Sequence, residues 1–330
     1  MKKSIYVFSN GTIKRDENTI LIENENGKKY IPIENTSEIY LFGEIALNTK
    51  LLNYLSEKEI ILHYFNYYGY YSGSIYPRFH LSSGAVILNQ AKYYLDIIKR
   101  MELAKLIEKG SAENILVNLK YYKNRGRDLT ENIEKIEKLK DSFISQKDIN
   151  SLMLLEANMR EIYYSAFNKI INNINFPFER RTRRPPQNNL NSIISFVNSM
   201  LYTAVLSEIY KTHMDPRIGY LHETNFRRFT LNLDVSEIFK PIIVDRLIFK
   251  LLNENMINEN NFNKIENMVS INDMGRKIII EELDKKLSTT ISYPGIAHKV
   301  SYKRLIRLEV YKLEKHILGD KVYEPYKSNW

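Results

Sequence analysis

The hydrophobic pattern of this 330-residue chain changes its period near residue 80. Before that point, short apolar runs alternate with turn signals; after it, apolar residues recur every three or four positions. A period of two buries one face of a sheet, whereas a period near 3.6 buries one face of a helix. The change therefore predicts two regions with different structures, residues 1–80 and residues 81–330.

The first region has the features of a small β domain. Two Asn-Gly dipeptides, at positions 10–11 and 26–27, are hairpin signals. Residues 67–76 are rich in Tyr, Gly and Ser and predict a last hairpin, and residues 48–57 predict one short helix capped by Asn48 or Thr49. Five apolar runs have the length of strands: residues 4–9, 19–23, 29–33, 38–42 and 60–65.

The second region has a helical pattern. Loops are expected at residues 176–186 and 215–224, where Pro and Gly interrupt it. The predicted fold class is therefore α+β, with a small N-terminal β domain followed by a larger all-α domain. The expected helices are residues 86–109, 112–125, 130–145, 150–173, 188–213, 234–255, 273–289 and 302–318.

Composition excludes several classes of protein. The chain has no cysteine, which rules out disulfides, thiolate metal sites and cysteine nucleophiles. It has no run of about 18 apolar residues, and its first apolar stretch is too short for a secretory signal, so we expect a cytoplasmic protein without a membrane span. The net charge of +9 and the 24 tyrosines suit a surface that meets phosphates and bases, although an AT-rich genome explains the tyrosines equally well.

Three acidic residues and one histidine are candidates for a metal site. Glu156 lies within an apolar helix. Burying a carboxylate without a partner costs roughly several kcal/mol, and a bound cation would offset this cost. His222 lies in a loop shaped by Pro216 and Gly219. Asp234 and Glu237 are three positions apart, so a helix would place both on one face.

Each candidate also has a purely structural interpretation. Glu156 and Arg160 have the spacing of a surface salt bridge within one helix. Asp234 and Glu237 have the spacing of a capping box, with Asp234 as the N-cap residue. His222 is then a hydrogen-bonded loop histidine. Composition and spacing alone leave these alternatives open.

A basic segment precedes two prolines at positions 185 and 186. The prolines prevent a helix and hold the segment extended, so Arg181, Arg183 and Arg184 could bind successive phosphates. The alternative is a solvated loop. Further candidates for phosphate binding are Arg217, Arg227, Arg228, Lys299, Lys303, Arg304 and Arg307.

Four motifs resemble those of a known family in the same order. They are Glu-Ala-Asn-Met-Arg-Glu-Ile-Tyr-Tyr at 156–164, Arg-Thr-Arg-Arg-Pro-Pro at 181–186, Asp-Pro-Arg-Ile-Gly-Tyr-Leu-His at 215–222 and Asp-Val-Ser-Glu-Ile-Phe-Lys-Pro at 234–241. The chain resembles, over nearly its whole length, the CRISPR-associated endonuclease that acts as the integrase of spacer acquisition.

This resemblance implies a function and a set of partners. It implies that Glu156, His222 and Glu237 bind Mg²⁺ or Mn²⁺, with Asp234 close by and also part of the catalytic site. It implies that the protein inserts short double-stranded DNA fragments into a CRISPR array by transesterification from a 3′-hydroxyl. The implied partners are a second copy, bound through the N-terminal domain, and a small ferredoxin-like CRISPR-associated protein.

Two other functions use the same residues. One is a metal-dependent nuclease that cleaves branched DNA in repair or recombination. The other is a DNA-binding module without enzymatic activity, in which Glu156, His222 and Glu237 are structural.

Overall fold

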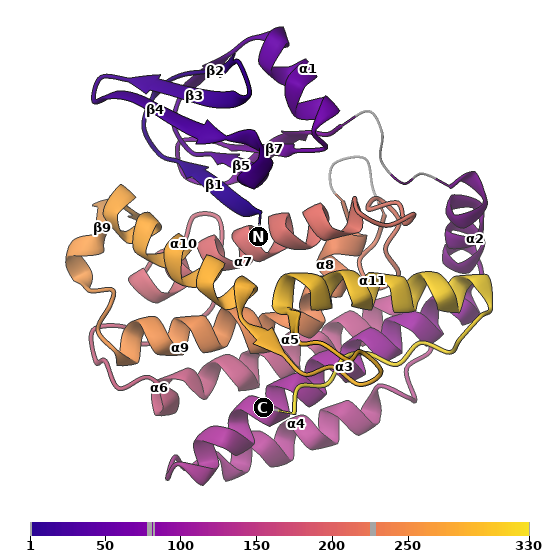
Figure 1. Ribbon diagram of the computed structural model, residues 1–330. Helices are drawn as coiled ribbons and strands as arrows, with labels where there is room; N and C mark the ends of the chain where they lie inside the picture. The colour runs from indigo at the N-terminus through magenta and orange to yellow at the C-terminus, as the bar shows by residue number, and fades with distance from the viewer. Residues whose placement is uncertain (1, 78–80, 82, 225–228, 330) are drawn as a thin grey trace. The chain divides into compact units, whose positions relative to one another are not determined.

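The computed structural model describes residues 2–77, 81, 83–224 and 229–329 (Figure 1). The chain divides into two compact units, residues 1–81 and 82–330. The first is built mainly of strands and the second mainly of helices, so the predicted α+β fold class is confirmed.

The N-terminal unit contains two four-stranded sheets. One has the order β1-β5-β7-β8, with β1, β5 and β7 parallel and β8 antiparallel to β7. The other has the order β4-β3-β2-β6, in which only the β2–β6 pair is parallel. The strands are β1 (Lys3–Val7), β2 (Gly11–Asp16), β3 (Thr19–Asn24), β4 (Gly27–Pro32), β5 (Thr36–Leu41), β6 (Ile45–Leu47), β7 (Ile61–Phe65) and β8 (Tyr71–Ile75).

Side chains from both sheets and from helix α1 (Thr49–Glu57) form one apolar core. Asn48 caps α1 by accepting a hydrogen bond from the amide of Leu51 at 2.9 Å, as predicted. The turn at 26–27 joins β3 and β4 into a hairpin, but the one at 10–11 does not join a hairpin, because β1 and β2 belong to different sheets. Strands β2 and β6 are additions to the predicted set.

The C-terminal unit is a bundle of helices with two short β-ribbons that the sequence pattern did not indicate. The ribbons are β9 (Phe262–Ile265) with β10 (Met268–Ile271), and β11 (Thr290–Ile291) with β12 (Val300–Ser301). The helices are α2 (Gly84–Leu95), α3 (Ile97–Asn124), α4 (Thr130–Ser142), α5 (Ile149–Ser165), α6 (Phe167–Ile170), α7 (Asn189–Ile209), α8 (Leu231–Phe239), α9 (Arg246–Asn253), α10 (Asp273–Ser288) and α11 (Tyr302–Leu318).

Several helix boundaries differ from those expected, and the helix expected at 150–173 is divided into α5 and the short α6. Asp96 has an extended backbone and its side chain accepts hydrogen bonds from the amides of Ile98 and Lys99, so it ends α2 and starts a continuous α3. The expected helix at 234–255 begins earlier, at Leu231, and is interrupted by a π-helical segment, η2 (Lys240–Asp245). Pro241 has no N–H to donate, which disrupts the regular ladder there.

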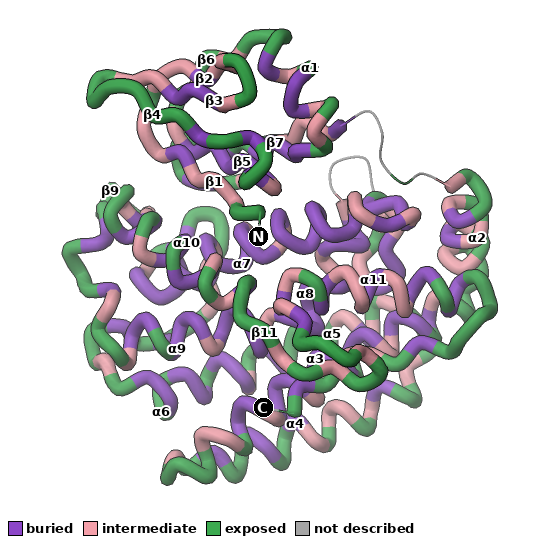
Figure 2. The backbone as a smooth tube through the Cα atoms, viewed as in Figure 1, coloured by how far each residue is buried: buried purple, intermediate pink, exposed green. Residues whose placement is uncertain are grey.

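Helix α7 is mostly buried (Figure 2) and packs against α8, α11, η2 and β10. Its 21 residues and the mean hydropathy of 1.3 in its most apolar 18-residue window match a membrane span, which the absence of a long apolar run had not suggested. However, 83% of this window is buried in the folded chain. A core helix of a folded domain has the same properties, so this is weak evidence for a span.

The last residues run as an extended segment over α3. The side-chain amide of Asn114 donates to the carbonyl of Tyr326 at 2.9 Å and its oxygen accepts from the amide of Ser328 at 2.9 Å. Gly110 lies on the same part of α3, and a Cβ added there would be 2.5 Å from the Cβ of Pro325. The missing side chain therefore allows the segment to pack closely.

We expect Gly110→Ala to destabilise the C-terminal unit by about 1–3 kcal/mol, because Pro325 or the helix must shift. Calorimetric unfolding would measure this loss. Gly84→Ala is the matched control, since Gly84 is also helical and an added Cβ there meets nothing within 4 Å. We expect the control to be neutral or stabilising by up to about 1 kcal/mol. Equal effects in both variants would contradict the close-packing explanation.

Candidate functional site

A buried arginine joins the two helices that carry the predicted acidic residues. Arg160 of α5 lies 2.5 Å from a carboxylate oxygen of Glu237 on α8 and 3.3 Å from Glu156, one turn earlier on its own helix. It also donates to Ser111 of α3 at 3.2 Å. Arg160 is only 6% exposed, so the pair is not the surface salt bridge of the structural interpretation.

Glu237 has a second cationic partner. Lys240, the first residue of η2, forms an ion pair with its other oxygen. Burial alone would raise the pKa of Glu237, but the charges of Lys240 and Arg160 outweigh it and hold the pKa well below its ordinary value. Glu237 is therefore a buried carboxylate compensated by two cations.

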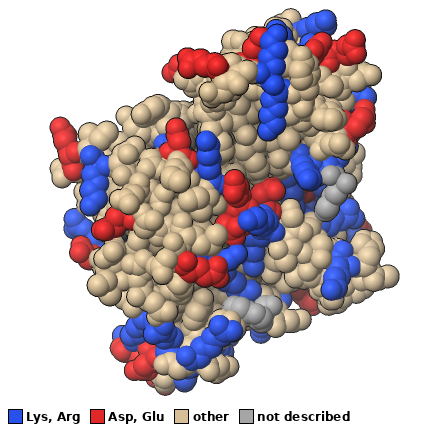
Figure 3. Space-filling view, turned by 60° about the vertical axis from the view of Figure 1, so that its left-hand side comes forward, with Lys and Arg blue, Asp and Glu red and all other residues tan. Residues whose placement is uncertain are grey.

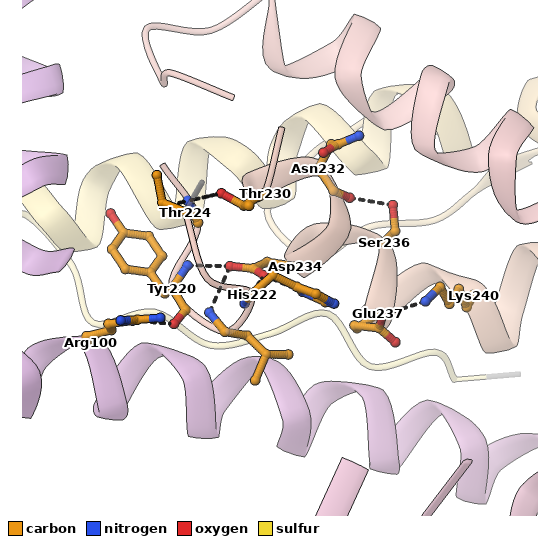
Figure 4. Close-up of polar contacts among 12 residues, drawn as sticks. Arg100, Tyr220, His222, Thr224, Thr230, Asn232, Asp234, Ser236, Glu237 and Lys240 are labelled. Atoms are coloured by element: carbon orange, nitrogen blue, oxygen red, sulfur yellow. Dashed lines mark hydrogen bonds and ion pairs between the residues drawn. The ribbon is translucent and has the colours of Figure 1, made fainter. Parts of the chain in front are cut away.

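Asp234 anchors the loop that carries His222 (Figure 4). One of its oxygens accepts from the amides of Tyr220 and, at 3.0 Å, Leu221. The other accepts from the amide of His222 at 2.9 Å and from its ring Nδ1 at 2.8 Å. Asp234 is fully buried inside α8, and the residue at the N-cap position is Thr230, so the capping-box interpretation is wrong.

The same loop is fixed from two other helices. Gln90 of α2 donates to the carbonyls of Asp215 and Ile218 and accepts from the amide of Asp215. Arg100 of α3 donates to the carbonyl of Tyr220 at 2.9 Å. Gly219 permits the close approach, because a Cβ there would be 2.8 Å from Asp234. The position of His222 is therefore set by three helices.

These contacts fix the orientation of the His222 ring. Since a carboxylate oxygen accepts, Nδ1 of His222 carries the hydrogen and Nε2 is left for another partner. Burial alone would lower the pKa of His222, but the hydrogen bond and charge of Asp234 raise it overall. A histidine held in this way by a carboxylate is the usual arrangement of a metal-binding imidazole.

Glu108 of α3 is a further acidic residue that the sequence reading missed. It is fully buried, and neither of its carboxylate oxygens has a hydrogen-bond partner among the described residues. Burial, together with the charges of Glu156 and Glu237, raises its pKa well above the ordinary value. The sequence contains a pattern that could have identified Glu108, because this residue interrupts an apolar stripe on its helix as Glu156 does on α5.

Asp245, at the end of η2, is a second buried carboxyl in this region. Its side chain is 2% exposed, and burial raises its pKa to about 7 despite the charge of Arg160. Two buried carboxyls, Glu108 and Asp245, thus lie within the electrostatic influence of Arg160, in addition to the two that pair with it.

The predicted metal ligands Glu156, His222 and Glu237 lie in one region, but in this structure they are not arranged closely enough to hold one metal ion. Among the residues that the structure describes, no three His, Asp or Glu side chains converge closely enough to share one metal. Glu156 and Glu237 instead share Arg160, while His222 faces Asp234. Metal binding by Glu156, His222 and Glu237 stays a prediction.

The three arginines of the basic segment differ in their surroundings. Arg181 points inward, where its guanidinium donates to Asn191 at 3.0 Å and to Ser195 at 2.9 Å. Arg183 and Arg184 are exposed. Arg181 therefore holds the segment against α7, and the two others are available to a ligand.

The remaining candidates for phosphate contact differ in their exposure and in their ion-pair partners. Arg217 is exposed and pairs with Asp215, and Arg307 is bound to Glu208 at 2.7 Å. Lys299 and Arg304 are exposed and Lys303 is half-buried. Arg227 and Arg228 lie outside the described residues. On the face seen in Figure 3, Lys and Arg side chains are interspersed with Asp and Glu.

Comparison with known proteins identifies the family. The model of the family described as CRISPR associated protein Cas1 matches residues 5–285. The chain belongs to the Cas1 family. A CRISPR-associated endonuclease Cas1 from Thermodesulfovibrio yellowstonii is 51% identical over 330 residues, all of both chains. A Cas1 endonuclease from Thermotoga maritima is 46% identical over 321 residues, 97% of this chain and 98% of that one.

Solved Cas1 structures have the same fold. The structure of a Cas1 protein from Thermotoga maritima superimposes with a TM-score of 0.88 at 44% identity, covering 98% of this chain and 100% of that one. A casposase bound to its integration product has a TM-score of 0.89 at 18% identity, covering 99% and 94%. At that identity the likeness shows only that the two proteins share a fold.

We expect Asp234→Asn to release the loop of His222. The amide nitrogen of Asn would face N–H donors, and each buried group left unsatisfied costs about 1–3 kcal/mol. Hydrogen exchange at the amides of Tyr220, Leu221 and His222 should speed up by about a hundredfold or more.

The control is Ser236→Ala, a buried change on the same helix whose hydroxyl bonds only within it, to the carbonyl of Asn232. We expect it to leave exchange in the loop unchanged. Slow exchange in the Asp234 variant would show that Gln90 and Arg100 hold the loop without it.

Proposed function

We propose that the protein is a metal-dependent DNA endonuclease and integrase that inserts short DNA fragments into a CRISPR array. The observation that carries this proposal is the group of a half-buried Glu156, a buried Glu237 and a carboxylate-oriented, half-buried His222 in a Cas1-family chain. Its relatives of 42–51% identity, matched over nearly their full length, include several named CRISPR-associated endonucleases.

The side chains have the chemistry that Mg²⁺ or Mn²⁺ requires. Glu156 and Glu237 offer hard oxygens, and Nε2 of His222 adds a nitrogen that also suits Mn²⁺. The buried carboxyl of Glu108 without a partner is a further sign that this region has room for positive charge. When bound, such a cation polarises the scissile phosphate and lowers the pKa of the attacking hydroxyl.

The chain's own residues would orient and stabilise the reacting groups. Asp234 holds the ring of His222, so Nε2 keeps one direction. Arg160 and Lys240 now neutralise Glu237, and a cation in their place would free one or both to contact phosphate oxygens. Glu237 would therefore be paired with positive charge both before and after a metal ion binds.

The proposed reaction is a transesterification. The 3′-hydroxyl oxygen of the fragment forms a bond to a phosphorus at the repeat boundary, and the bond from that phosphorus to the 3′-oxygen of the neighbouring nucleotide breaks. The attacking hydroxyl loses its proton to solvent and the leaving oxygen gains one. With water as the attacking group the same site would hydrolyse the strand.

The partners belong to the proposal as well. Arg183, Arg184, Lys299 and Arg304 are exposed and could contact the DNA backbone, which positions DNA without reading its sequence. We propose a homodimer through the N-terminal unit and an assembly with a small ferredoxin-like CRISPR-associated protein in the cytoplasm. Cas1-family chains occur in solved Cas6-RT-Cas1–Cas2 complexes, one with a TM-score of 0.84 at 16% identity.

We expect Glu156→Gln to lower metal-dependent strand joining by about a hundredfold or more, because a lost charged ligand costs several kcal/mol. Its stability should change by only about 1 kcal/mol, since the side chain is 16% exposed and Arg160 keeps Glu237. Glu237→Gln is a poorer test because it would leave two buried cations undercompensated and destabilise the fold.

The assay is the joining of a short duplex to a supercoiled CRISPR-array plasmid with Mg²⁺ or Mn²⁺. Glu161→Gln, an exposed change on the same helix, is the control and should join normally. Nicks without joined products would favour the branched-DNA nuclease, and full activity of the Glu156 variant would reject the site. Calorimetry that detects no metal binding would favour the non-enzymatic module.

We expect replacement of Arg183 and Arg184 by Ala to flatten the salt dependence of DNA binding. Each phosphate contact contributes about 0.9 to the slope of log affinity against log salt, so the slope should fall by about two units. The charge-matched control replaces Lys135 and Lys138 of α4, which are also exposed. An unchanged slope would mean that the segment is a solvated loop.

A further inference from the structure

A cavity of about 520 Å³ lies where the end of α3, helix α9 and the end of α10 meet. Five cationic side chains line it, against the single carboxylate of Glu254. Glu156, His222, Asp234 and Glu237 are not among the described residues that line it, so it is separate from the site above. The five cations are Arg125, Arg127, Arg246, Lys250 and Lys286.

These cations differ in their partners. Lys250 forms an ion pair with Glu282 at 2.7 Å. By contrast, Arg127 donates to the side-chain oxygen of Asn172, and Arg246 donates to that of Asn118 at 2.7 Å. Amide oxygens fix the direction of a guanidinium without neutralising its charge.

The aromatic rings around the cavity hold two further cations. The guanidinium of Arg125 lies 4.4 Å from the centre of the Tyr121 ring, and Nζ of Lys286 lies 4.6 Å from the centre of the Tyr302 ring. These ring faces are therefore occupied and not open for a base to stack upon. The cavity offers positive charge more than it offers a stacking surface.

Crowding of like charges is unfavourable here. Burial, followed by the charges of Arg246 and Lys250, lowers the pKa of Lys286 to about 8. Burial likewise lowers the pKa of Arg246. An anion between these groups would relieve both the repulsion and the loss of solvation. The volume is in the range of pockets that hold ligands of nucleotide size.

We propose that this cavity binds a compact phosphate-bearing anion carrying two or more phosphate charges. Guanidinium groups bind phosphate oxygens in pairs, and an ammonium adds a movable donor. The same chemistry is found in a free nucleotide and in the phosphorylated end of a nucleic-acid strand. The proposal does not depend on the metal site, since it shares none of the residues proposed to bind metal.

The test is calorimetric titration of the full chain with inorganic pyrophosphate, in EDTA so that no metal bridges the ligand to the carboxylates. We expect one site per chain. Lys286→Gln and Arg127→Gln should each weaken binding about tenfold, and the double variant about a hundredfold. Lys277→Gln removes an exposed charge from the same helix, α10, outside the cavity, and should stay within twofold of the unaltered protein.

Two further ligands distinguish the sources of phosphate. ADP represents a free nucleotide, and decanucleotides with a 5′-phosphate or a 5′-hydroxyl represent a strand end. A preference for the 5′-phosphate that Lys286→Gln abolishes would assign the cavity to strand ends, whereas tight binding of ADP alone would assign it to nucleotides. Glu156→Gln should leave the affinity for pyrophosphate unchanged.

The proposal is overturned if pyrophosphate does not bind, or if Lys277→Gln weakens binding as much as the cavity variants do. The melting temperature of each variant, measured without ligand, shows whether that variant is folded. Loss of the crowded Lys286 charge should not lower this temperature. Arg127 is half-buried and lies just beyond the end of α3, away from α10, so its variant is a second, separate test should the Lys286 variant fail to fold.

Discussion

The arrangement of the candidate site depends on one buried guanidinium. Arg160 is almost inaccessible to solvent and has carboxylates from two helices and a hydroxyl from a third around it. A buried charge that loses its partner costs about 3–5 kcal/mol, so α3, α5 and α8 are held at the separation that keeps these contacts. Glu156 and Glu237, distant in sequence, are neighbours for this reason.

A second constraint acts on the imidazole. Asp234 gathers three consecutive amides and the ring of His222, and Gln90 and Arg100 hold the same loop from α2 and α3. The loop is therefore ordered by side chains of helices, although it has no regular structure itself. Arg160 positions the carboxylates of Glu156 and Glu237, and Asp234 separately positions the imidazole of His222. The proposed cation would bind to both the carboxylates and the imidazole.

Positive charge serves different purposes in different parts of the helical unit. Arg160, Arg181 and Lys240 are partly or wholly buried and hold the fold together. Arg183 and Arg184 are exposed and suited to a long polyanion, whereas Arg127 and Lys286 line a cavity of about 520 Å³ that suits a small one. Net charge alone could not separate these roles, because it records neither burial nor partners.

The sequence by itself determined the two regions, the cap of α1, the loops at 176–186 and 215–224, and the residue types of the site, since each of these is written in a local pattern of apolar, turn and acidic residues. The structural alternatives that it left open, Asp234 as a helix cap and Arg160 in a surface salt bridge, were wrong, and it overlooked Glu108. Only the tertiary structure decided these points. It also brought together the residues that line the basic cavity, which are as far apart in the sequence as Tyr121 and Tyr302. A local pattern shows which face of an element is buried, but the partner of a buried charge depends on which faces meet.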